Sequence, residues 1–177
     1  TNANQEVRGL VPEINSLAQR IVELNGRIRV AEATESQAND LRDDRDVLVD
    51  QLAALIDVSV LETNSGEYEV FIGGQEFITG SRVRTIEVVT NPLIDPTRPD
   101  LVELRFSDND ALVQVRDGEL FGALQIRDVE LPGIITGLHE MAATLIQQIN
   151  RIHSQGNGLN NLSGTITASN RVTDPTI

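Results

Sequence analysis

The sequence predicts an α+β protein: an antiparallel bundle or coiled coil of long helices with an inserted antiparallel β-meander. Near both ends of the chain, apolar residues recur at alternating steps of three and four, which is the period of one helix face. In between, the period shortens to two, as in a strand. We therefore expect a helical bundle domain from 1–57 and 118–158, a β subdomain at 58–117, and a linker or the start of a further domain at 159–177.

The first helix is predicted from Val7 to Ala31. Its apolar seam consists of Val7, Leu10, Ile14, Leu17, Ile21, Leu24, Ile28 and Ala31, widened by Val11 and Ala18. Pro12 lies inside this helix, where a proline costs about 3 kcal/mol. Burying Val7 and Leu10 returns about 1.5 to 3 kcal/mol each. Because these contributions are close in size, we expect the turn before Pro12 to fray or kink.

A second helix is predicted from Glu35 to Asp57. Thr34 is the expected N-cap, and Gln37 stands where a capping box requires it. The seam of this helix consists of Ala38, Leu41, Arg45, Leu48, Leu52 and Leu55. Since the connection to the first helix is short, the two helices should be antiparallel neighbours.

Alternating residues then predict five or six short strands, separated by turn residues such as Gly66. They are expected near 58–60, 68–72, 77–78, 82–90, 101–106 and 111–115, with turns at 64–66, 73–74 and 108–109. The segment 91–100 contains Pro92, Pro96 and Pro99 and should be an extended loop.

The helical period returns after Gly118. A helix begins around Leu120 and Phe121, and Pro132-Gly133 should interrupt or restart it. A third apolar seam follows, made of Leu131, Ile135, Leu138, Ala142, Leu145, Ile149 and Ile152. We expect this helix to pack against the first two, because an amphipathic helix is stabilised by burying its apolar face.

Composition excludes several classes of function. The net charge is −13, from 27 acidic and 14 basic residues, and every basic residue is Arg. Such a charge disfavours nucleic acid and anionic membrane as partners. There is no Cys, so disulfides and thiolate metal sites are excluded, and the aromatic content of 3% is low for a small-molecule pocket. The chain starts without Met, and we expect it to be a fragment of a longer protein.

No motif predicts a catalytic, cofactor-binding or metal-binding residue. His139-Glu140 is similar to the start of a zinc-protease helix, but Ala143 stands where the second His is required. His139 and His153 are too far apart on one helix to share a site. Gly73-Gly74 is followed by no helix start and no Lys, so it indicates a hairpin turn rather than a phosphate loop.

Acidic residues cluster on the second helix, at Asp40, Asp43, Asp44, Asp46 and Asp50. A hard divalent cation needs several oxygens that converge, whereas carboxylates along a straight helix diverge. A solvated acidic face is therefore the favoured interpretation. A divalent-metal-dependent enzyme that uses the segment 40–50 remains a remote alternative.

Arg45 occupies a seam position where Leu would be expected. A buried guanidinium must be paired, and such a pair can fix the register of a helix. Our hypothesis is that Arg45 holds the second helix against a carboxylate of another segment, with Asp128 as one option. The candidates for such a structural role are Arg45, Asp46, Arg127 and Asp128. Alternatively, Arg45 lies at the edge of the seam with its head in water.

Three segments together resemble the family of flagellar hook-associated protein 1, the proteins at the hook–filament junction. The first is Leu24-Asn25 with Ile28. The second is Asn-Asp-Leu-Arg-Asp-Asp-Arg-Asp at 39–46, continuing to Val60. The third is Gly-Glu-Leu-Phe-Gly-Ala-Leu at 118–124, followed by Arg127-Asp128, Leu131-Pro132-Gly133, Leu138, Ala142, Asn150, His153 and Gly156. The resemblance covers most of 14–158. The segment 91–100 has no counterpart, and the family's terminal core-forming segments are not in the sequence.

The resemblance implies a structural protein of the bacterial flagellum without enzymatic activity or cofactor. The implied partners are copies of itself, the hook protein and the next junction protein. The implied location is extracellular, reached through the flagellar type III export apparatus without a cleaved signal peptide. An alternative is another axial protein, either flagellin or hook-associated protein 3, because their long helices would give much the same pattern.

Overall fold

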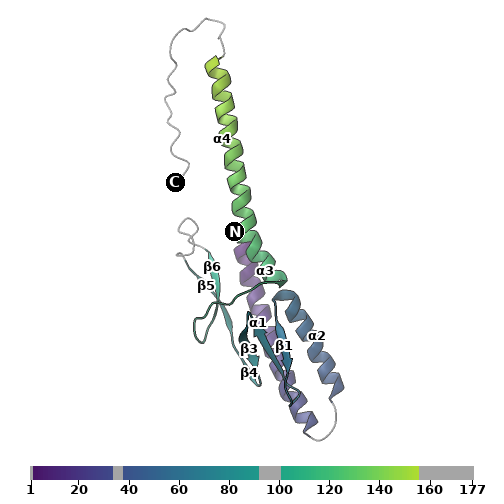
Figure 1. Cartoon of the computed structure of the whole chain (residues 1–177). Helices are drawn as coiled ribbons and strands as arrows, with labels where there is room; N and C mark the ends of the chain where they lie inside the picture. Colours follow the sequence, from purple (N-terminus) through teal and green to yellow (C-terminus); the bar gives the residue numbers. More distant parts are fainter. Residues whose placement is uncertain (1, 34–37, 92–100, 156–177) are drawn as a thin grey trace. The chain divides into compact units, whose positions relative to one another are not determined.

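The computed structural model describes residues 2–33, 38–91 and 101–155 (Figure 1). Two helices are followed by strands and then by further helices, and the paired strands are antiparallel. The predicted α+β class is confirmed. The chain divides into two compact units, 1–133 and 134–177, which we describe separately.

Helix α1 runs from Asn2 to Glu32 without a break at Pro12. The prediction that the turn before Pro12 frays is therefore wrong. Val7 is fully buried and Leu10 is 8% exposed, so the apolar contacts on this side of the proline offset its missing hydrogen bond. The predicted seam is buried from Val7 to Ile28, and Ala31 is half-buried.

Helix α2 runs from Asn39 to Leu55 and returns beside α1 (Figure 1). It begins later than predicted, because its N-cap is Ala38, which has no side-chain cap. The backbone N–H of Ala38 donates to Glu32 Oε1 at 3.3 Å, which links the residue before α2 to the end of α1. The predicted cap, Thr34 with Gln37, lies outside the described residues. On the seam, Arg45, Leu48, Leu52 and Leu55 are buried.

The strands form two sheets. A four-stranded meander contains β1 (Ser59–Glu62), β2 (Tyr68–Ile72), β3 (Gln75–Thr79) and β4 (Arg82–Val83), in that order. A separate ribbon pairs β5 (Ile86–Thr90) with β6 (Val102–Phe106). Of the expected strand at 111–115, only a single bridge from Leu112 to Arg105 is present. The predicted loop at 91–100 lies outside the described residues, except for Asn91.

The strand predicted at 82–90 is divided at Arg84, and this residue provides the physical reason. Its guanidinium donates to both carboxylate oxygens of Asp108, at 2.8 and 2.7 Å, and lies 3.7 Å from the centre of the Phe106 ring. Its backbone N–H still bonds Phe77 of the first sheet. Arg84 therefore fixes the point where the chain passes from one sheet to the other.

A single apolar core joins α1, α2, the segment 118–125 and both sheets. Its members include Ile14 and Ile21 from α1, Leu52 from α2, Phe77 from β3 and Phe106 from β6. The sheets and the helices thus share one interior, and 58–117 does not enclose a separate core. The predicted division into a helical bundle and a β subdomain differs from the two compact units of the structure.

Helix α3 (Gly118–Gln125) is continued by a π-helical segment η1 (Ile126–Glu130) and by α4 (Leu131–Gln155). Pro132 is the second residue of α4, and the helix passes through Pro132-Gly133 with a π-helical segment directly before them. Gly118 has a φ of +87°, and a Cβ added there would lie 2.8 Å from the carbonyl oxygen of Leu55. Only glycine allows α3 to begin this close to the end of α2.

The predicted third seam lies on α4 and is exposed. From Ile134 onward its large apolar residues are 45 to 66% exposed: Ile134, Ile135, Leu138, Met141, Leu145, Ile146, Ile149 and Ile152. The packing of this seam against the first two helices stays a prediction.

Candidate functional site

Arg45 is the most deeply buried charged residue of the described chain, with 0% of its surface exposed. It sits on the seam of α2, so the helix itself directs the side chain inward. Nη1 donates to Asn25 Oδ1 at 2.9 Å and to the carbonyl oxygen of Gly66 at 2.7 Å. Within the described residues, Nε and Nη2 have no hydrogen-bond partner. The alternative that Arg45 extends to water is therefore wrong.

The ring of Tyr68 covers the Arg45 guanidinium, with the carbon Cζ 3.4 Å from the ring centre. A cation over an aromatic face gains electrostatic energy from the ring, and more where water is excluded. Burial, followed by the neighbouring carboxylate of Asp46, raises the pKa of the Tyr68 hydroxyl. Tyr68 therefore stays neutral at physiological pH.

Asn25 ties this cluster together and is itself fully buried. Its Oδ1 accepts from Arg45 and from the backbone N–H of Tyr68 at 3.0 Å, while its Nδ2 donates to the carbonyl oxygen of Tyr68 at 2.9 Å. One amide thus links α1, α2 and β2. Sequence reasoning did not assign a role to Asn25, although a polar residue next to the seam residue Leu24 was a signal.

Asn15 repeats the arrangement further along α1. Its Nδ2 donates to the carbonyl oxygen of Ile86 at 2.8 Å, and its Oδ1 accepts from the N–H of Ile86 at 2.9 Å. This amide links α1 to β5 as Asn25 links it to β2. Sequence reasoning missed Asn15 as well, because Asn inside a helix usually indicates only a solvent-facing position.

The hypothesis that Arg45 pairs with a carboxylate of another segment is wrong for the described residues. Asp128 instead accepts two bonds from Arg127, at 2.8 and 2.7 Å. Arg127 is 6% exposed and also donates to the carbonyl oxygen of Val102 at 2.9 Å and to Asn4 Oδ1 at 3.3 Å. The two predicted arginines are thus both buried, but each belongs to its own cluster.

An ion-pair network surrounds the turn that follows β1. Arg42 donates to both oxygens of Glu32, at 2.7 and 2.8 Å, and to Glu62 Oε1 at 2.6 Å. The hydrogen bonds from Arg42 lower the pKa of the Glu32 carboxyl from 4.5 to about 2. They hold the end of α1, the start of α2 and β1 together.

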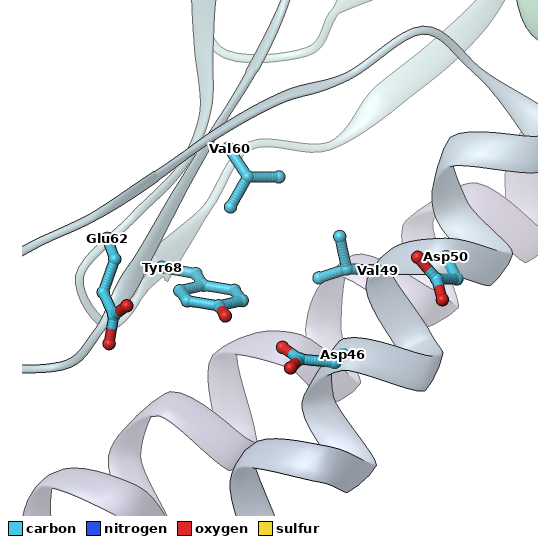
Figure 2. A pocket seen from close by; sticks show the side chains of 6 residues that line it. All are labelled: Asp46, Val49, Asp50, Val60, Glu62 and Tyr68. Carbon is cyan, nitrogen blue, oxygen red and sulfur yellow. The ribbon is translucent and has the colours of Figure 1, made fainter.

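Asp46 lines an open groove of about 500 Å³ between α2 and the sheet. Figure 2 shows Asp46, Val49 and Asp50 on α2 facing the strand residues of the groove. The strand side consists of Val60, Glu62 and Tyr68. Of the sequence-predicted candidates, Asp46 is therefore the one that lies on an accessible surface feature beside the buried Arg45.

The described residues do not form a metal centre or a transmembrane helix. No group of three or more His, Asp or Glu within them converges on a point where a metal ion could be held, and this includes the acidic residues of α2. None of the helices in this part of the chain is both long and apolar enough to span a membrane. The buried polar groups instead link elements of the fold to one another.

The structure defines the class of protein: an α+β module built around long amphipathic helices. Buried amides and arginines connect the short strands to these helices. The chain belongs to the family of the flagellar hook-associated protein FlgK helical domain, whose model matches residues 1–166. This result confirms the resemblance found in the sequence.

The names of similar proteins agree with the assignment of the chain to this family. The flagellar hook-associated protein 1 of Salmonella typhimurium is 27% identical over 159 residues, which is 86% of this chain and 29% of the relative. The Escherichia coli protein of the same name is 26% identical over 167 residues, 91% of this chain and 30% of that protein. The chain thus spans less than a third of the length of these relatives.

A solved structure of the flagellar hook junction protein FlgK from Burkholderia pseudomallei is also similar. The TM-score is 0.59 at 28% sequence identity, over 71% of this chain and 23% of that one. The family match and these relatives favour hook-associated protein 1 over the alternatives of flagellin and hook-associated protein 3.

Proposed function

We propose that this chain is the helical domain of a hook–filament junction protein and acts mechanically rather than as an enzyme. The family match supports the proposal, as do the names of the relatives, one of which is called a hook junction protein. The proposed partners are copies of the same protein, the hook protein and the next junction protein. The proposed location is the extracellular flagellum, reached by type III export without a cleaved signal peptide.

The observation that carries this proposal is the exposed apolar seam of α4. A helix whose large apolar side chains share one side, each about half exposed, is unusual for a protein that acts alone. The remaining face of α4 carries polar residues such as Glu140 and Gln147. In the full-length protein, other segments of the same chain or neighbouring subunits would cover such a seam.

The buried clusters supply the stiffness that a junction needs. Arg45 and Arg127 are proposed to fix the register of α2 and of η1, because each donates to partners from two other segments. Buried polar groups specify an arrangement since any shift leaves them unpaired. In this scheme Asp128 holds the guanidinium of Arg127 in place. Asp46 interacts with the hydroxyl of Tyr68, whose ring covers Arg45.

Two experiments test the proposal in cells. Antibody against this chain, imaged by electron microscopy, should label the junction between hook and filament. In the full-length protein, Leu145→Asp with Ile149→Asp should abolish assembly of the filament while the protein is still exported and folded. Ala143→Asp with Gln147→Asp, at the same spacing on the opposite face, is the matched control. Label along the whole filament, or normal assembly of the seam variant, would contradict the proposal.

A further inference from the structure

The groove beside Asp46 lies at an open edge of the four-stranded sheet. β1 is the first strand in the order β1-β2-β3-β4, so it has a neighbour on one side only. Its residues Ser59–Glu62 are exposed at every position, including Val60 at 39% and Leu61 at 57%. An edge strand of this kind can pair with a further strand.

The hydrogen-bond alternation identifies which backbone groups are free. The N–H of Thr63 bonds the carbonyl oxygen of Glu67, just beyond the last β1–β2 pair, Glu62 and Tyr68. In an antiparallel ladder, bonded and non-bonded pairs alternate. Leu61 and Ser59 therefore bond β2, and the N–H and C=O groups of Val60 and Glu62 point to the open edge.

Val60 and Glu62 also line the groove with their side chains, so the open edge of β1 lies beside the groove (Figure 2). The groove, about 500 Å³ in volume, has room for the inward-facing side chains of one extended segment. Val49, Val60 and the Tyr68 ring would contact the methylene groups of those side chains.

The charge of the groove selects the partner. Asp46 and Asp50 are exposed, and neither forms an ion pair with another described residue. Of the nearby cations, Arg45 is fully buried and Arg42 is engaged by Glu32 and Glu62. The groove therefore presents uncompensated negative charge, which favours Lys or Arg in the incoming segment.

We propose that β1 accepts an extended basic segment of a partner protein by strand addition, with its Lys or Arg side chains against Asp46 and Asp50. This mode takes its affinity from backbone hydrogen bonds and its specificity from pockets for alternate side chains. A second copy of the chain fits poorly, because it carries a net charge of −13 and would bring the same carboxylates together. The inference stands on the geometry of this edge and is independent of the junction role.

The test uses the chain of residues 1–177 and a fluorescein-labelled eight-residue peptide of alternating Lys and Val, with binding followed by fluorescence anisotropy. The peptide should bind with an affinity that falls as salt rises. A peptide with Glu for Lys should not bind. A Lys-Val peptide that is N-methylated at each Lys loses the N–H groups that would bond Val60 and Glu62. It keeps its charge and should also fail to bind, which separates strand addition from simple charge attraction.

Variants of the chain locate the site. Val60→Pro removes a free N–H without breaking the bonds to β2, because proline is tolerated where the N–H faces solvent on an edge strand. It should weaken binding at least about tenfold, and Asp46→Asn with Asp50→Asn about fivefold. The matched control, Asp43→Asn with Asp44→Asn, makes the same change of charge on α2 outside this groove and should leave affinity unchanged.

Circular dichroism verifies that each variant is folded, and hydrogen exchange on the wild-type complex gives a readout free of mutation. Bound peptide should protect the amides of Val60 and Glu62. Absence of binding, equal binding of the N-methylated peptide, or protection elsewhere would overturn the proposal. Sedimentation that shows a dimer of the chain, lost in Val60→Pro, would assign the edge to a second copy and would also overturn it.

Discussion

The amide oxygen of Asn25 accepts hydrogen bonds from Arg45 at 2.9 Å and from the backbone N–H of Tyr68 at 3.0 Å. A single buried side chain on α1 thus holds a cation from α2 and a strand of the sheet. This relationship explains how an arginine can replace a leucine on an apolar seam. It also predicts where the fold is most sensitive to the loss of one polar group.

Asn25→Ala should lower the free energy of unfolding by about 2 to 4 kcal/mol, because it leaves a buried cation and a strand N–H without their acceptor. Arg45→Leu should cost less, since a buried charge with two unpaired nitrogens is replaced by an apolar group. Urea denaturation of both variants and of the double variant measures their coupling. The exposed Asn150→Ala is the control. Additive effects, or a cost for Asn25→Ala below about 0.5 kcal/mol, would contradict the shared cluster.

Gly118→Ala should destabilise the chain by at least about 2 kcal/mol. The residue has a φ of +87°, which costs an L-residue about 1 to 2 kcal/mol, and its Cβ would press on the backbone of Leu55 at 2.8 Å. Gly122→Ala, in the same helix and with open space around it, should instead stabilise by up to about 1 kcal/mol. Thermal unfolding compares the two, and equal melting temperatures would disprove the close approach of α3 to α2.

The pKa of Glu32 predicts a specific pH dependence. In the folded state it is lowered from 4.5 to about 2, so the carboxylate stabilises the fold above pH 4.5 and loses this effect as the pH falls through about 2. The melting temperature of Glu32→Gln should therefore lie below that of the wild type at pH 7. The gap should narrow between pH 4.5 and 2. Glu13→Gln, at an exposed position of α1, should show no such gap.

Association of the chain should increase with salt. Each copy carries a net charge of −13, and the repulsion between copies is screened beyond about 10 Å at 0.1 M salt and at shorter range as salt rises. The exposed apolar seam of α4 can then make contact. Light scattering at about 0.02 and 0.5 M salt measures the effect. Equal association at both concentrations would show that charge does not control these contacts.

Much of the fold was predictable because local periodicity is written in the residues themselves. The seam of α1 is buried as predicted, and so is the α2 seam from Arg45 to Leu55. Apolar side chains at helical spacing lie on one side of a helix and can be buried together. The turn at Gly66, where φ is positive, follows equally from backbone chemistry. The resemblance to hook-associated protein 1 depended on several such segments in the right order.

The polar clusters were less predictable. Arg45 was recognisable as an anomaly on the seam, but its partner was not, because Asn25 and Gly66 reach it only through the packing of three elements. Arg84 gave no local sign that it would divide a strand, since its partners Phe106 and Asp108 lie at the end of β6 and in the turn that follows it. Side chains that bind distant backbone or distant side chains follow no sequence period.

The sequence by itself determined where most of the helices and strands lie, which helix faces are apolar, and the family to which the chain belongs. These follow from short-range spacing and from the identity of side chains. The tertiary structure decided that the strands split into two sheets and that the sheets and α3 share the interior with α1 and α2. Such outcomes depend on which apolar surfaces pack against one another in three dimensions. The spacing of residues along the chain does not specify that choice.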